Sequence, residues 1–177
     1  FKQFNEFKKL AKSSLFMSGS AMRYNYQILK FNKKFLKGIK SIHGKSHSNI
    51  ETYGYHLIEP IIILFGKRIK FVKYIDSNKD RDLIQIFYQN GLNVILEFTN
   101  KLKLPIKLSM FSEKYDDKEI YFNDFYNSFK LMLEKFVLAI KQKRQILPRN
   151  DIYFINKLII SLINSKKKNF KKIFIKE

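Results

Sequence analysis

Residues 82–99, DLIQIFYQNGLNVILEFT, decide the fold class of this 177-residue chain. Two runs rich in aliphatic and aromatic residues flank the dipeptide Asn90-Gly91. An Asn-Gly pair between such runs is the strongest short-range signal for a β-hairpin, because both residues tolerate the positive φ of a tight turn. The same composition predicts further strands over 68–76, 105–113 and 119–123. A mainly antiparallel sheet is therefore expected.

Apolar residues at helical spacing predict five helices around this sheet. They cover residues 4–12, 24–38, 54–66, 124–144 and 152–168. Gly38 and Gly66 are natural helix ends, and Asp124 is a natural N-cap. Pro60 lies inside the third of these stretches, so we expect either a kink or a helix that starts nearer Glu59.

Short apolar stretches complete the pattern as strands over 13–20, 39–46 and 171–175. The helix and strand within 4–20 are typical of the last unit of a parallel α/β sheet. The remainder predicts an α+β fold, in which a mostly antiparallel open sheet carries helices packed on one face. Its strands hold apolar residues at positions of both parities, so the opposite face is a candidate interface.

The net charge of +20 has two interpretations. A basic surface could bind nucleic acid or an anionic membrane. Alternatively, codons rich in A and T could raise the content of lysine, asparagine, isoleucine and phenylalanine together. The lysines are spread along the chain, with one dense run at 166–172, and arginine is rare. This distribution favours codon composition, and neither a nucleic-acid nor a membrane partner is expected.

The chain contains no cysteine, which excludes disulfide scaffolds, thiolate zinc sites and cysteine nucleophiles. This fits a reducing compartment, and we expect a cytoplasmic protein. No apolar run reaches the roughly 18 residues that span a bilayer. The sequence begins with phenylalanine rather than methionine, so a missing upstream segment stays open.

Four stretches, in this order, resemble the C-terminal part of a known family. They are GSAMRY (19–24), GIKSIHGKS (38–46), YGYHLIEPIIILFG (53–66) and the two helical stretches within 125–169. The family is the glucose-fructose oxidoreductase, inositol dehydrogenase and MocA-type family of NAD(P)-dependent sugar oxidoreductases. The resemblance makes residues 1–23 the remnant of a nucleotide-binding Rossmann domain, and residues 24–177 a substrate-binding and oligomerisation domain.

The resemblance also implies roles for individual residues. His56 matches the family's catalytic histidine, which lies close to the substrate carbon that exchanges hydride. Imidazole titrates near neutral pH and so suits a base or relay for the hydroxyl proton. Arg23, Tyr24, Tyr53 and Glu59 are the accompanying candidates for substrate binding. The implied partners are a sugar or nucleotide-sugar substrate, NAD or NADP, and further copies of the chain bound through the open sheet face.

Other interpretations of these residues stay open. Glu59 could hold His56 or face water, and Arg23 could merely pair with a core carboxylate. Tyr53 and Tyr55 could pack, or one of them could stack on a sugar ring. His43 and His47 read as surface histidines rather than metal ligands, because no third ligand is close in sequence, and no metal is expected.

The sequence departs from the family at three points. Thr52 stands where the family often has an aspartate, no Glu-Lys-Pro motif supplies a lysine, and no Gly-x-Gly-x-x-Gly loop follows a strand. The chain alone is therefore not expected to bind a dinucleotide in the family's manner, and is expected to be inactive without the cofactor half.

Three functions remain in view. The first is the substrate-binding and oligomerisation part of a sugar or nucleotide-sugar oxidoreductase. The second is a non-catalytic interaction or scaffold module derived from that family. The third, which the spread of the lysines disfavours, is a basic nucleic-acid-binding domain.

Overall fold

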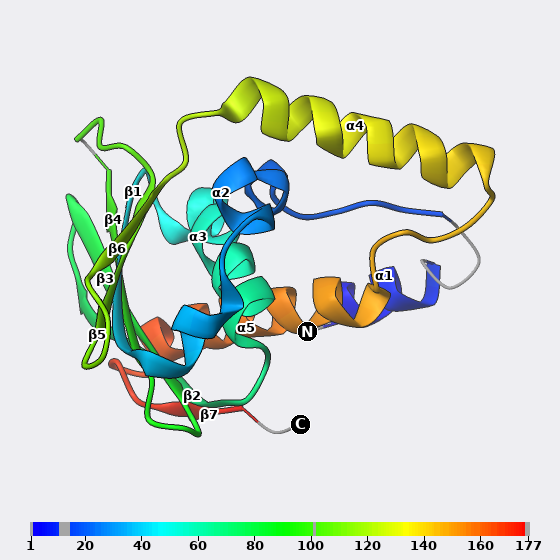
Figure 1. Cartoon of the computed structure of the whole chain (residues 1–177). Helices are drawn as coiled ribbons and strands as arrows, with labels where there is room; N and C mark the ends of the chain where they lie inside the picture. The colour runs from blue at the N-terminus through cyan, green and yellow to red at the C-terminus, as the bar shows by residue number, and fades with distance from the viewer. Residues whose placement is uncertain (1, 11–14, 101, 176–177) are drawn as a thin grey trace.

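The computed structural model describes residues 2–10, 15–100 and 102–175 (Figure 1). The helical elements are α1 (Lys2–Leu10), η1 (Ala21–Tyr24), α2 (Tyr26–Leu29), η2 (Lys33–Gly38), α3 (Ile50–Phe65), α4 (Phe125–Lys141) and α5 (Arg149–Lys167). The strands are β1 (Ile39–His47), β2 (Ile69–Ser77), β3 (Arg81–Tyr88), β4 (Asn93–Thr99), β5 (Lys107–Ser112), β6 (Lys118–Tyr121) and β7 (Ile173–Phe174).

The strands form one seven-stranded sheet in the order β6-β5-β1-β4-β3-β2-β7. The central pair β1 and β4 is parallel, and all the other neighbours are antiparallel. Helices α3 and α5 lie on one side of this sheet (Figure 1). The predicted α+β architecture, with a mostly antiparallel open sheet and helices on one face, is confirmed.

The predicted hairpin joins β3 and β4. Gly91 has a φ of 88°, and the backbone N–H of Tyr88 donates to the carbonyl of Leu92 at 3.0 Å. Along β3 the side chains alternate between buried and half-buried, and β4 repeats this alternation over most of its length. The local turn chemistry therefore sets the register that turns one face of the sheet toward the helices.

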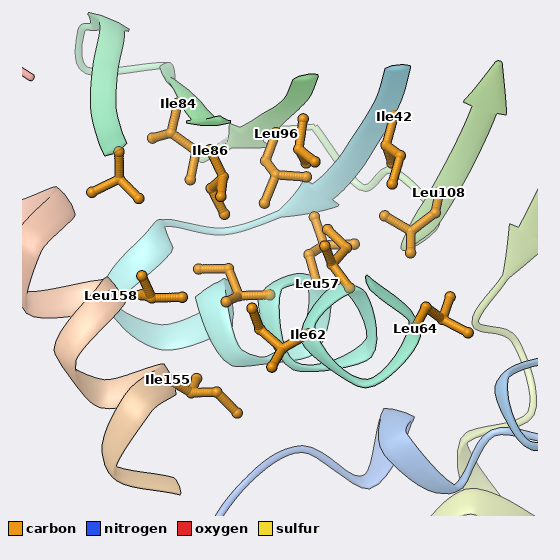
Figure 2. Packing of buried hydrophobic residues seen from close by; sticks show 14 of the residues in the cluster. Ile42, Leu57, Ile62, Leu64, Ile84, Ile86, Leu96, Leu108, Ile155 and Leu158 are labelled. Carbon is orange, nitrogen blue, oxygen red and sulfur yellow. The ribbon is translucent and has the colours of Figure 1, made fainter. Parts of the chain in front are cut away.

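Helix α3 packs against β1 and β4, and α5 packs against β2 beside it. Figure 2 shows Leu57 of α3 facing the sheet residues, with Leu158 of α5 to the side of α3. Leu57, Ile58 and Ile61 have no exposed surface. Gly44 in β1 leaves room for these side chains, because a Cβ there would lie 2.5 Å from Leu96 Cδ2 of β4 and 3.4 Å from Leu57 Cδ1 of α3. The apolar composition of α3 thus makes it the centre of the core.

Helix α3 begins earlier than expected, at Ile50, and Pro60 lies inside it. The Asn49 side chain accepts a hydrogen bond from the Thr52 backbone N–H and caps the helix. Gly66, with a φ of 79°, ends it. The expectation of a start near Glu59 was wrong, because the cap at Asn49 and ten helical residues before the proline secure the first turns.

The single helix expected over 24–38 is wrong. The structure divides this stretch into η1, α2 and η2. The Asn25 and Asn32 side chains accept hydrogen bonds from the backbone N–H groups of Gln27 and Lys34, respectively, and each starts a new short element. Asparagine competes for backbone hydrogen bonds in this way, so apolar periodicity alone was misleading.

The strand expected over 13–20 is not seen in its described part, residues 15–20. Its backbone bonds with a side chain instead of another strand. The Gln145 side-chain amide accepts from the Phe16 N–H at 3.3 Å and donates to the Phe16 carbonyl at 2.6 Å. Of the helix expected over 4–12, residues 11 and 12 lie outside the described residues, and α1 covers the rest.

Helix α4 forms as predicted but stands away from the sheet (Figure 1). Much of its apolar face is exposed, including Phe125, Phe129, Leu133, Val137 and Ile140. Its buried residues are Ser128 and Ala139. The apolar stripe of α4 was therefore not a guide to the core of this chain.

Within the described residues, no helix is long and apolar enough to cross a membrane.

Candidate functional site

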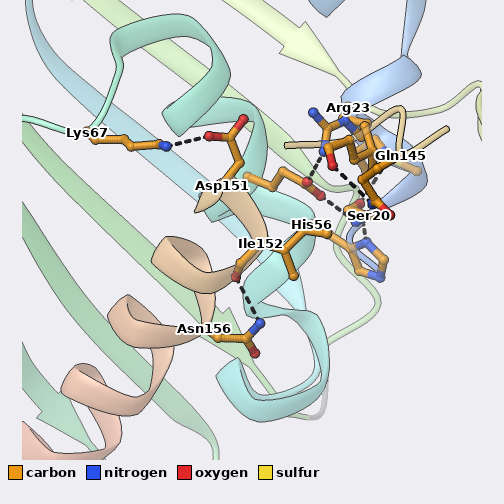
Figure 3. Close-up of polar contacts among 11 residues, drawn as sticks. Ser20, Arg23, His56, Lys67, Gln145, Asp151, Ile152 and Asn156 are labelled. Atoms are coloured by element: carbon orange, nitrogen blue, oxygen red, sulfur yellow. Dashed lines mark hydrogen bonds and ion pairs between the residues drawn. The ribbon is translucent and has the colours of Figure 1, made fainter. Parts of the chain in front are cut away.

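The segment that leads into η1 lies against α3, and Figure 3 shows Ser20 and Arg23 beside His56 of this helix. The Glu59 carboxylate accepts a hydrogen bond from the Ser20 backbone N–H and forms an ion pair with Arg23 Nη1 at 2.6 Å. Gly19 makes this approach possible: its φ is 134°, and a Cβ there would lie 2.7 Å from Glu59 Oε1. A glycine at position 19 is thus required both by the backbone conformation and by the carboxylate.

Glu59 is a buried carboxyl whose side chain is 1% exposed, and that of Arg23 is 12% exposed. Burial raises the pKa of Glu59 to about 7, although the Arg23 guanidinium and the Ser20 N–H act in the opposite direction. The more distant Asp151 adds to the rise in the pKa. Glu59 is therefore the carboxyl that holds this segment in place and one that titrates near neutral pH.

His56 lies one helical turn before Glu59 on α3. Its Nδ1 atom lies 2.6 Å from Ser20 Oγ. The Tyr53 ring packs edge-on against the His56 ring, with the centroids 5.0 Å apart. The centroid of the His47 ring lies 4.4 Å from that of Tyr53. Burial lowers the pKa of His56, and the nearby His47 lowers it further. The neutral form of the imidazole is therefore favoured.

Tyr24 contacts Arg23 of the network but packs in a separate apolar cluster. The Arg23 guanidinium carbon lies 5.7 Å from the Tyr24 ring centroid. The ring packs with Leu147 and Ile152 in a small second apolar cluster, and burial raises the pKa of the hydroxyl. The five residues selected from the sequence therefore lie in one region, with Tyr24 at its apolar edge.

No role in this region was predicted for Gly19, Ser20 or His47, whereas Tyr55 was expected to pack or to stack on a sugar ring. Burial raises the pKa of Tyr55, and the charge of Glu59 adds to the rise. Only Ser20 carried a usable signal, because serine is a common N-cap and Ser20 accepts from the Met22 N–H at the start of η1. The contacts to His56 and Glu59 join residues 36 and 39 positions apart, which no local pattern reveals.

A cavity of about 190 Å³ lies beside this network, between the segment 17–20 and α4. Ser20 and Arg23 line it together with apolar residues of α4, whereas His56 does not. A second hollow, of about 370 Å³, lies where Arg23 and Glu59 meet Lys67 and Asp151, which form an ion pair (Figure 3). Arg23 therefore borders both spaces.

Thr52 and His43 make contacts elsewhere in the fold. The Thr52 hydroxyl bonds with Asn49 at the start of α3. His43 is exposed on the outer sheet face against Phe111. Within residues 2–10, 15–100 and 102–175, no three metal-ligating side chains come together. Gly19, Gly66 and Gly91, the described glycines with positive φ, lie before η1, at the end of α3 and in the β3–β4 hairpin, respectively.

Neither a protein-family model nor a curated protein sequence matches the chain. Solved structures do. Myo-inositol 2-dehydrogenase from Lactobacillus plantarum is 16% identical, with a TM-score of 0.79 over 99% of this chain and 70% of that chain.

Two further similar structures contain NAD. Scyllo-inositol dehydrogenase from Lactobacillus casei, with bound NAD(H) and scyllo-inositol, is 13% identical, with a TM-score of 0.72 over 98% of this chain and 69% of that chain. GenD2 from gentamicin A biosynthesis, in complex with NAD, is 9% identical, with a TM-score of 0.79 over the same shares. In fold, the chain resembles the C-terminal domain of the glucose-fructose oxidoreductase, inositol dehydrogenase and MocA-type oxidoreductases.

Proposed function

We propose that this chain is the substrate-binding and oligomerisation part of an oxidoreductase that transfers hydride between NAD(P) and a sugar, nucleotide sugar or cyclic polyol. His56 contacts the oxygen on the reacting carbon. Arg23 and Glu59 hold the segment that borders the site, and Tyr53 supplies an aromatic wall. Tyr24 supports Arg23 from the apolar side.

The arrangement around His56 is the observation that carries this proposal. One ring nitrogen is engaged by Ser20, and no hydrogen bond to Nε2 occurs among the described residues. The ring is half-buried between Tyr53 and Ser20, so a ligand oxygen at Nε2 would meet a fixed imidazole. A positioned group at the reacting oxygen is what hydride transfer to or from a carbinol carbon requires.

In this proposal, NAD or NADP is held by residues outside this chain. When bound, the cofactor would supply or accept the hydride. Its own residues bind and orient the substrate. The reaction would be completed only when a nicotinamide-binding domain covers the side of the site that Arg23 and Ser20 border.

The outer sheet face is the proposed oligomer interface. Ile95 lies near its centre, paired with His43 on β1 and Gln85 on β3. Phe87 stacks on Phe71 at 5.2 Å on the same face. Apolar side chains without a helix above them are stabilised by covering with a second apolar surface, and a second copy of the sheet supplies one.

Titration calorimetry with scyllo-inositol, myo-inositol and glucose tests the substrate role. At least one of these polyols should bind the wild-type chain, and His56→Gln should weaken its binding by tenfold or more. His43→Gln is the matched control, because His43 lies on the outer sheet face and should leave binding unchanged. The proposal is refuted if none of the three compounds binds, or if His56→Gln leaves the binding unchanged.

A further inference from the structure

We propose that Ser20 is a positioning residue that fixes neutral His56 in the tautomer with its proton on Nε2. In this tautomer His56 presents a hydrogen-bond donor, and not a base, to whatever binds at its free nitrogen. Nothing in the sequence pattern around His56 specifies the tautomer, because the partner lies 36 residues earlier in the chain.

The hydrogen-bond inventory of the Ser20 hydroxyl leads to this assignment. A serine hydroxyl has one hydrogen to donate and two lone pairs that accept. Ser20 Oγ accepts from the Met22 backbone N–H at 3.0 Å. Its other contact among the described residues is His56 Nδ1, at 2.6 Å. The hydroxyl hydrogen therefore has one acceptor available, and this acceptor is Nδ1.

The opposite tautomer leaves a donor without a partner. If Nδ1 carried the proton, Ser20 Oγ would accept from both Met22 and His56, and its own hydrogen would point to no acceptor among the described groups. Ser20 is 1% exposed, so water does not replace the missing acceptor. A buried donor without an acceptor is strongly disfavoured.

Ser20 is also prevented from turning away. Its backbone N–H donates to the buried Glu59 carboxylate, and its side chain caps η1. Glu59 is in turn paired with Arg23. The hydroxyl is thus held at a fixed place beside the ring, and the lowered pKa of His56 keeps the ring neutral near pH 7.

The functional consequence rests on the proposed function, whereas the tautomer does not. A neutral imidazole with its proton on Nε2 can donate to a substrate oxygen and stabilise negative charge that develops there. It cannot accept the hydroxyl proton at Nε2. In the reduction direction His56 therefore acts as the hydrogen-bond donor that polarises the carbonyl.

Long-range ¹H–¹⁵N spectra of histidine-labelled protein at pH 8 test the tautomer directly. The chain has three histidines, so His56→Gln assigns the signal by its loss. We expect a protonated, pyrrole-type Nε2 and an unprotonated, pyridine-type Nδ1. A pyrrole-type Nδ1 would overturn the proposal whether or not any polyol binds.

Two variants test the role of Ser20. Ser20→Ala should move the Nδ1 signal and shift the population toward a mixture of tautomers. Ser46→Ala is the control, because Ser46 is a fully buried serine that donates to the His47 carbonyl instead. An unchanged His56 spectrum in folded Ser20→Ala protein would show that Ser20 does not set the tautomer. If that variant fails to fold, the wild-type spectrum still decides.

Discussion

The buried Glu59 carboxyl should give the free energy of unfolding a pH dependence of unusual sign for an acid in an ion pair. Burial raises the pKa of Glu59 from 4.5 to about 7. Between these pH values the folded protein holds a proton that the unfolded chain has released. The stability that Glu59 contributes is therefore present in full below pH 4.5 and is lost as the pH rises through 7.

The size of this effect follows from the difference in pKa. A difference of about 2.5 pH units, at about 1.36 kcal/mol per unit, corresponds to about 3 kcal/mol. Glu59 has no exposed surface, so solvent screening takes little from this value. His56 acts with the opposite sign: burial lowers its pKa, so the folded protein binds this proton less readily than the unfolded chain, and the stability that His56 contributes is lost as the pH falls through the lowered pKa.

Urea unfolding of the wild type and of Glu59→Gln from pH 4 to pH 8 separates the two contributions, since His56 is present in both proteins. The stability of the wild type relative to the variant should fall by about 3 kcal/mol across this range. Glu51→Gln controls for the loss of a carboxyl on the same helix, because Glu51 is exposed. A difference that is constant, or that rises with pH, would refute the reasoning and show that the ion pair with Arg23 outweighs burial.

Two further predictions concern the segment before η1 and the sheet face. Gly19→Ala should destabilise the protein by about 2 to 3 kcal/mol in urea unfolding, because the positive φ and the contact with Glu59 both oppose a Cβ. Gly66→Ala, which has positive φ but no close neighbour, should cost only about 1 kcal/mol, and equal losses would contradict the role of the carboxylate. Ile95→Glu should lower the mass measured by light scattering to that of a monomer, whereas Leu102→Glu, at an exposed position off the sheet, should not. An unchanged mass for Ile95→Glu would exclude this face as the interface.

The elements that the sequence predicted well are those with a strong local signal. The β3–β4 hairpin follows from Asn90-Gly91, and α3 ends at Gly66 as expected. The predicted α+β sheet with helices on one face also follows from these local periods. Local signals were sufficient here because the turn, cap and burial pattern of each element agree.

The failures have two causes, local side-chain caps that interrupt a helix and contacts between residues far apart in the chain. Asn25 and Asn32 capture backbone N–H groups and break the expected helix over 24–38. The apolar stripe of α4 predicts a buried face, yet much of it is exposed in this chain. The Ser20–His56 contact was invisible for a similar reason, since it depends on how η1 is placed against α3.

The central claim is that a polyol binds at His56, and the three histidine signals test it most directly. In ¹H–¹³C spectra, addition of scyllo-inositol should move the ring signals of His56 and leave His43, on the outer sheet face, in place. His47 should move less than His56, because its ring contact among these residues is with Tyr53, which in turn contacts His56. The claim is contradicted if saturating concentrations of scyllo-inositol, myo-inositol and glucose leave the His56 signals unchanged. It is also contradicted if they move only the His43 signals.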